Sequence, residues 1–172
     1  MSRPRRLLNL LYDGSAALAA LAMVGLLVAV LLSVIGRQLG FNVPGIDAYA
    51  GFLLAATGFL SLAHTLKRGE HIRVTLLLNA LHAKPRRGLE LWTLLAGVLL
   101  AGLFAVYAAK LAWQSREFND VSTGNDATPL WIPQLSMALG AAVLLIAMLD
   151  ELVLELRGKR MLPVSEEATR NE

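Results

Sequence analysis

Residues 14–36 read GSAALAALAMVGLLVAVLLSVIG, an apolar run without Asp, Glu, Lys or Arg. At about 1.5 Å per residue, a helix of this run reaches roughly 34 Å, enough to cross the hydrocarbon core of a bilayer. Similar uncharged runs occupy residues 48–66, 91–109 and 127–149. A soluble domain of 172 residues has no use for four such runs. The sequence therefore predicts an all-α integral membrane protein with four transmembrane helices.

Composition and charge limit the domain size, the kinds of site and the partners that this chain can have. Hydrophobic residues make up 56% of it. The length suits one small membrane domain over residues 1–160, followed by a cytoplasmic tail at 161–172 that we expect to be disordered. The absence of Cys excludes thiol catalysis, disulfide exchange and thiolate metal sites. The net charge of +3 comes from Lys and Arg beside the apolar runs, so it indicates a lipid bilayer as partner and no nucleic acid.

Lys and Arg are distributed unevenly between the two sides of the predicted membrane domain. Thirteen of the 16 lie before the first run, between the second and third, or after the fourth. Arg37, Lys110 and Arg116 lie on the other side. Because cationic residues are retained on the cytoplasmic side, both termini and the loop between the second and third helices are predicted to be cytoplasmic.

Two segments outside the runs have the composition of surface helices. Within residues 67–90, four apolar residues follow the spacing of an amphipathic helix: Val74, Leu77, Leu78 and Leu81. We expect a short helix there, ended by Pro85 and lying in the membrane plane or against a partner. Residues 3–12 combine Arg with Leu, and indicate either a short interfacial helix before the chain turns into the membrane or a frayed terminus.

Small residues recur at spacings of three and four within three of the predicted spans. They are Ala22, Gly25, Ala29, Ser33 and Gly36 in the first, Gly51, Ala55 and Gly58 in the second, and Gly97, Ala101 and Ala105 in the third. Such stripes let helix backbones approach closely in lipid. They predict helix–helix contacts, within one subunit or between subunits.

The sequence offers little that could perform chemistry. The interiors of the four runs lack Asp, Glu, Lys and Arg, the residues that usually mark ion pathways and proton relays at membrane depth. This absence argues against a self-contained proton-driven pump. His64, near the cytoplasmic end of the second span, is interpreted as a hydrogen-bonded interfacial residue rather than a haem ligand. We predict no catalytic, cofactor-binding or metal site.

Three short motifs lie at the ends of the spans. The first is Arg37, Gly40-Phe41-Asn42, Pro44 and Asp47, around the loop between spans one and two. The second is GEHIRV at residues 69–74, and the third is TPLWIP at residues 128–133. In this order they resemble the small membrane subunit of tripartite ATP-independent periplasmic (TRAP) transporters. The second motif is similar to the Gly-His-Ile-x-Val element of that family. Where many relatives carry a Trp and paired acids at span two, this chain reads GIDA at residues 45–48.

The resemblance implies a scaffold role in the bacterial inner (cytoplasmic) membrane. In that family a large membrane subunit holds the transport path and the sodium sites, and a periplasmic substrate-binding protein captures an organic acid such as a dicarboxylate or a sialic acid. The small subunit packs beside the large one, performs no enzymatic reaction and needs no cofactor. Its expected structural or subunit-contact residues here are Arg37, Asp47, Gly69, His71, Val74, Pro129 and Trp131.

Two other functions are compatible with four membrane spans. An independent small four-helix transporter or channel would need a polar pathway, for which the spans offer scattered Ser and Thr. A membrane enzyme or electron-transfer subunit would need a bound redox group, which an absorption spectrum of the purified chain would detect.

Overall fold

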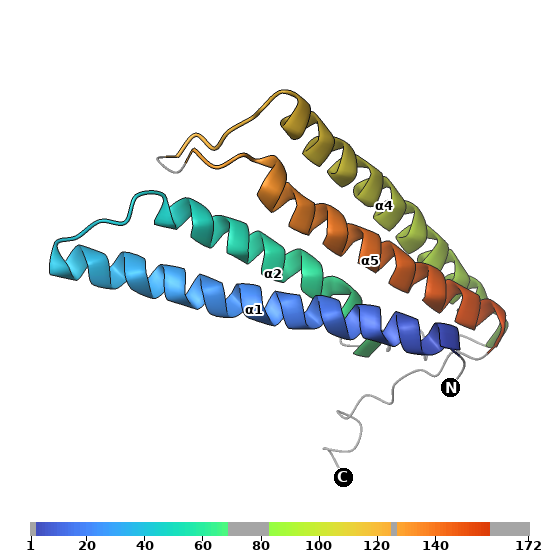
Figure 1. The fold of residues 1–172 in the computed structure, drawn as a ribbon. Coiled ribbons are helices and arrows are strands. Elements are labelled where there is room, and N and C mark those ends of the chain that lie inside the picture. The colour runs from blue at the N-terminus through green and yellow to red at the C-terminus, as the bar shows by residue number, and fades with distance from the viewer. Residues whose placement is uncertain (1–2, 69–82, 125–126, 159–172) are drawn as a thin grey trace, which may run out of the picture.

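The computed structural model describes residues 3–68, 83–124 and 127–158 (Figure 1). Its four long helices are α1 (Arg3–Leu39), α2 (Ile46–Arg68), α4 (Ala83–Glu117) and α5 (Trp131–Leu156). Each helix is long and apolar enough to cross a membrane. The prediction of an all-helical fold with four helices long and apolar enough to span a membrane is therefore confirmed for the described residues.

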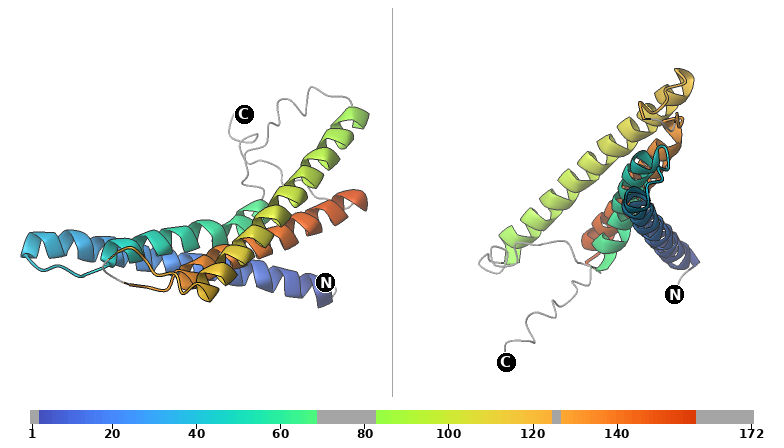
Figure 2. Two further views of the ribbon diagram at one scale, coloured as in Figure 1. Left: turned by 90° about the horizontal axis from the view of Figure 1, so that it is seen from above. Right: turned by 90° about the vertical axis from the view of Figure 1, so that its left-hand side faces the viewer.

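The helices stand side by side in the order α1, α2, α5, α4 (Figures 1 and 2). α2 packs against α1 and α5, α4 packs against α5, and α1 touches α5 over a short stretch only. α1 and α4 thus form the two edges of an open layer. Because neither edge is covered, many large apolar side chains of α1 and α4 are exposed and available to lipid or to another protein.

The closest approach in the layer joins the two middle helices. A methyl group at Gly140 of α5 would lie 2.5 Å from the carbonyl carbon and oxygen of Phe59 in α2. Phe59 in turn stacks on Phe104 of α4, with ring centroids 5.5 Å apart. The missing side chain of Gly140 lets the two backbones meet, as small residues do in membrane helix pairs.

The predicted small-residue stripes are used differently in the different helices. Gly25 of α1 lies against Leu53 of α2, since a methyl group added at Gly25 would be 3.3 Å from a Leu53 side-chain carbon. Ala101 of α4 is buried. By contrast, a methyl group at Gly51 or Gly58 of α2 would meet open space. The stripes of α1 and α4 therefore pack within the chain, whereas these two glycines of α2 do not.

The helices extend beyond the apolar runs. α1 is one continuous helix of 37 residues from Arg3 to Leu39, so the expectation of a separate interfacial helix or a frayed terminus at residues 3–12 is wrong. The segment stays in line with the span because Arg5 and Tyr12 interact with α2 and α5. α4 likewise continues to Glu117, eight residues past the predicted end of the span at residue 109.

α5 begins later than predicted, at Trp131 instead of residue 127. Ala127 has a φ of 45°, in the left-handed region that an α-helix cannot use. Pro129 forms an isolated antiparallel bridge with Val121, which fixes the end of the loop before the helix starts. α5 then continues to Leu156, seven residues beyond the apolar run.

A tight turn joins α1 to α2. Gly40 has a φ of 75° and ends α1, and the amide of Phe41 donates to the carbonyl of Gly36 at 3.0 Å. This bond commonly closes a helix at a left-handed glycine. Gly45 has a φ of 78°, and its carbonyl accepts hydrogen bonds from the amides of Ala48 and Tyr49 in the first turn of α2. Both ends of the turn are therefore fixed by backbone bonds.

The chain ascends and descends in alternation, so α1 begins and α5 ends at the same end of the layer (Figure 1). We call this end, where α2 also ends and α4 begins, the first end, and the opposite one the second end. The amphipathic helix expected around Val74 to Leu81, and the tail at residues 161–172, lie outside the described residues.

Candidate functional site

Charged side chains from three helices meet at the first end of the layer. Asp150 of α5 accepts hydrogen bonds from Arg5 Nη1 of α1, at 3.1 Å, and from Lys67 Nζ of α2. Lys67 also donates to Glu151 Oε1 at 3.0 Å, and its Nζ lies 5.3 Å from the ring centroid of Tyr12. We call Arg5, Tyr12, Lys67, Asp150 and Glu151 the ion-pair cluster.

Three charged side chains of the ion-pair cluster are largely shielded from water, while the fourth, Arg5, is 38% exposed. Side-chain exposure is 12% for Asp150, 13% for Glu151 and 16% for Lys67. Tyr12 continues into an apolar core with Ala63 and other residues of α2 and α5. Charges withdrawn from water in this way need their partners, because removing one leaves the other buried and unpaired. The cluster therefore fixes α1, α2 and α5 relative to one another.

The sequence analysis missed the ion-pair cluster. Lys67 and Asp150 directly follow the second and fourth apolar runs, and nothing in the sequence pairs them. The signal that could have revealed it is the position of Asp150 and Glu151, two acids directly after the fourth run, at membrane ends otherwise rich in Lys and Arg. Acids that remain in such a region are candidates for ion pairs with the neighbouring spans.

His64 lies near the cluster, on the last turns of α2. Its Nδ1 is 3.7 Å from Asp13 Oδ1 of α1, within the range of an ion pair and beyond hydrogen-bonding distance. Asp13 itself is 71% exposed at its side chain. This contact adds a second, weaker link between α1 and α2.

At the second end of the layer, Arg37 and Asp47 lie on either side of the α1–α2 turn. Ser33 Oγ donates to Asp47 Oδ1 at 2.9 Å, and Arg37 Nη2 donates to the same Ser33 Oγ at 3.4 Å. Ser33 thus connects the two charged residues. All of these contacts are exposed. The role of Arg37 and Asp47 in holding the hairpin or meeting another subunit stays a prediction.

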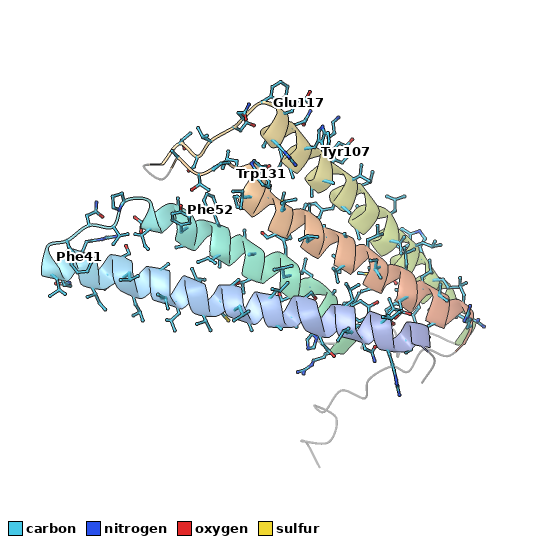
Figure 3. The ribbon with its side chains drawn as sticks, in the orientation of Figure 1. Phe41, Phe52, Tyr107, Glu117 and Trp131 are labelled. Atoms are coloured by element: carbon cyan, nitrogen blue, oxygen red, sulfur yellow. The ribbon has the colours of Figure 1, made fainter. Side chains whose placement is uncertain are left out.

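Pro129 and Trp131 stand where the α4–α5 loop enters α5. The carbonyl of Pro129 accepts from the amide of Ile132 at 3.2 Å. Arg116, at the end of α4, places its guanidinium carbon 5.5 Å from the Trp131 ring centroid, and Figure 3 shows Trp131 beside that end of α4. A cation facing an aromatic ring is attractive, so this contact joins the two helices.

The same loop also reaches α2. Thr128 Oγ1 donates to the phenolic oxygen of Tyr49 at 3.1 Å. Backbone bonds from Ser122 to Thr128 and from Leu130 to Asp120 close the loop on itself. The second end of the layer is therefore also tied together, by weaker contacts than the ion-pair cluster. Gly69, His71 and Val74 of the remaining motif lie outside the described residues, and their role stays a prediction.

Three hydroxyl groups within the α2 span bond to carbonyls of their own helix. Thr57 donates to the carbonyl of Leu53 at 2.8 Å, and Ser61 to that of Gly58 at 3.0 Å. One turn further along α2, Thr65 donates to the carbonyl of Leu62. Each donor is thus satisfied locally, and these hydroxyls do not line a polar route across the layer. Within the described ranges, no group of three or more His, Asp or Glu residues could hold a metal ion.

A comparison with protein-family models matches residues 26–158 to the model described as tripartite ATP-independent periplasmic transporters, DctQ component. The matched segment is 133 of the 172 residues and runs from the middle of α1 to just beyond the end of α5. It includes Lys67, Asp150 and Glu151 of the ion-pair cluster but not Arg5 or Tyr12. A search of curated proteins finds no match. The matched family is one of transporter components and not of enzymes. This multi-pass membrane protein therefore belongs to the DctQ family, the small permease of TRAP transporters.

Proposed function

We propose that this chain is the scaffold subunit of a sodium-coupled secondary transporter that imports an organic acid, such as a dicarboxylate or a sialic acid. It packs in the inner membrane against a large membrane subunit that holds the transport path and the sodium sites. A periplasmic substrate-binding protein delivers the solute. Family membership supports the assignment to a TRAP transporter. The organic-acid substrate is what the resemblance described in the sequence analysis implies.

The open layer is the observation on which the scaffold role rests. Its helices are fixed at the first end by the ion-pair cluster and in the middle by the Gly140–Phe59 approach. The hydroxyls of Thr57, Ser61 and Thr65 in α2 bond the backbone of their own helix. A rigid apolar layer with two uncovered edges suits a static frame beside a moving partner.

In this proposal the first end of the layer faces the cytoplasm. In the sequence, thirteen of the 16 Lys and Arg residues lie before the first apolar run, between the second and third, or after the fourth, and Arg5 and Lys67 of the ion-pair cluster are among them. The α1–α2 turn and the α4–α5 loop then face the periplasm, where the binding protein approaches. Glu117 ends α4 and Asp120 lies in the loop, as expected for the side with few cations.

Co-purification tests the proposal directly. The chain is tagged at its C-terminus, native membranes are solubilised in a mild detergent, and the retained proteins are identified by mass spectrometry. We expect a much larger membrane protein with many spans, at a near-equal amount. Recovery of the chain alone, or as a homo-oligomer that transports solute in liposomes, would contradict the scaffold role and favour an independent carrier. An unrelated tagged four-helix membrane protein serves as the control for detergent carry-over.

A further inference from the structure

Most acidic residues of the first end are withdrawn from the surface of the layer. Asp150 and Glu151 pair with cations inside the ion-pair cluster, at side-chain exposures of 12% and 13%. Glu90 and Glu155 are partly buried, and neither lacks a partner. Among the described residues at this end, Asp13 is the single exposed acid. The negative charge of the first end is therefore largely enclosed within the layer.

Three arginines of the same end lie on its surface. Arg6 near the start of α1, Arg87 near the start of α4 and Arg157 directly after α5 are all exposed. Within the described ranges, none of the three takes part in an ion pair. They belong to the end at which α1 and α4 begin and α5 ends (Figure 1). Because the acids are enclosed, the surface of the first end carries a positive charge.

Large apolar side chains are exposed close to each of these arginines. Leu7 and Leu10 follow the arginine of α1 and are 68% and 70% exposed. Leu156, directly before the arginine after α5, is 60% exposed, and Trp92, five residues after the arginine of α4, is 67% exposed. Arginine beside exposed apolar residues suits the boundary between acyl chains and headgroups, where the apolar groups meet hydrocarbon and the cations meet phosphate.

We infer that the first end of the layer binds anionic phospholipid headgroups, with Arg6, Arg87 and Arg157 pairing with the phosphates of the leaflet around it. A guanidinium group is suited to this, because it can donate two parallel hydrogen bonds to phosphate oxygens. Each cation near an anionic membrane surface strengthens the attraction by about fivefold. The neighbouring apolar side chains favour a lipid over a soluble phosphate, which would gain nothing from them. This inference goes beyond the proposed function and does not depend on it.

Spin-labelled lipids test the inference on the full chain. The protein is reconstituted in phosphatidylcholine vesicles that contain a trace of spin-labelled phosphatidylglycerol, which is anionic, or of spin-labelled phosphatidylcholine, which has no net charge. Electron paramagnetic resonance measures the fraction of each label whose motion is restricted at the protein surface. We expect a severalfold preference for phosphatidylglycerol at low salt. The preference should shrink at high salt, because ions screen exposed charges.

A pair of triple variants assigns the preference to one end of the layer. The first-end variant combines Arg6→Gln, Arg87→Gln and Arg157→Gln. The matched second-end variant combines Arg37→Gln, Lys110→Gln and Arg116→Gln. We expect the first-end variant to lose most of the preference for phosphatidylglycerol and the second-end variant to keep it. A third variant with Lys at the three first-end positions should also keep it, because the charges remain.

Several outcomes would overturn the inference. Equal restriction of the two lipids by the parental chain would show that no anionic lipid is selected. An undiminished preference in the first-end variant, or a loss confined to the second-end variant, would place the selection elsewhere. Loss in both the Gln and the Lys first-end variants would show that charge is not its origin, and the salt dependence of the parental chain tests that point without any substitution. Circular dichroism confirms that each variant is folded. Because the chain is measured alone, each of these results leaves the proposed function standing.

Discussion

Asp150 joins α5 to both α1 and α2 through ion pairs. It accepts hydrogen bonds from Arg5 of α1 and Lys67 of α2 at a side-chain exposure of 12%. Asp150→Asn keeps the shape but leaves both cations without this negative partner. Because breaking a buried ion pair from one side is costly, we expect a loss of about 3 kcal/mol in the free energy of unfolding. Unfolding of the purified chain in mixed micelles, titrated with a denaturing detergent, measures this loss.

Asp13 provides the matched control at the same end of the layer. Its side chain is 71% exposed, and its approach to His64 is 3.7 Å. We expect Asp13→Asn to change the free energy of unfolding by less than about 0.5 kcal/mol, as for most surface substitutions. Equal effects of the two substitutions would show that the ion-pair cluster does not hold the three helices together.

Asp47 belongs to a different kind of contact, exposed and at the second end of the layer. Its partner Ser33 donates at 2.9 Å, so Asp47→Ala removes the acceptor that joins α1 to α2 across the turn. We expect weaker assembly with the large subunit or slower uptake, without a change in which solute is preferred. Uptake by cells carrying the variant, with several competing organic acids, measures both properties. Asp120→Ala, on the other turn of the same end, is the control. Parental uptake and complex yield in Asp47→Ala would remove Asp47 from the contact residues.

Among the elements, the crossing of α2 and α5 is the most sensitive to volume. A methyl group at Gly140 would lie 2.5 Å from backbone atoms of Phe59, whereas one at Gly58 would meet open space. We expect Gly140→Ala to push the helices apart at a cost of about 1–3 kcal/mol, the usual range for overpacking. Gly58→Ala should be neutral or slightly stabilising, because Ala favours a helix more than Gly does. The same micelle titration compares the two variants, and equal stability would contradict a close crossing at Gly140.

The elements also show how far the sequence is informative. The four spans could be predicted because hydropathy alone selects them, and lipid allows an uncharged run of that length few alternatives to a helix. The residues at which the helices begin and end could not be predicted, because contacts outside the apolar runs determine them. Arg5 and Tyr12 extend α1 toward the N-terminus, while the left-handed Ala127 and the bridge at Pro129 delay α5. These contacts become visible only when segments far apart in the sequence are placed side by side.

At the scale of the whole molecule, the order α1, α2, α5, α4 is the property that the sequence does not contain. The spacing of small residues predicts that helices approach one another but not which pairs meet. Because α2 and α5 are adjacent in this order, Lys67 and Asp150 can form an ion pair, although they lie far apart in the sequence. The same order leaves α1 and α4 as edges and so raises the question of what covers each.

The orientation of the layer in the membrane follows from charge and can be tested on the intact cell. In the sequence, thirteen of the 16 cationic residues lie before the first apolar run, between the second and third, or after the fourth, so the first end should be cytoplasmic and the α4–α5 loop periplasmic. Two exposed positions become unique thiols, Thr123→Cys in the loop and Arg157→Cys after α5. A membrane-impermeant maleimide applied to spheroplasts should label Thr123→Cys at once and Arg157→Cys only after the membrane is permeabilised. The unsubstituted chain, which has no Cys, gives the background. The reverse order of labelling would invert the layer, place the ion-pair cluster at the periplasmic surface, and remove the α4–α5 loop from any contact with a periplasmic binding protein.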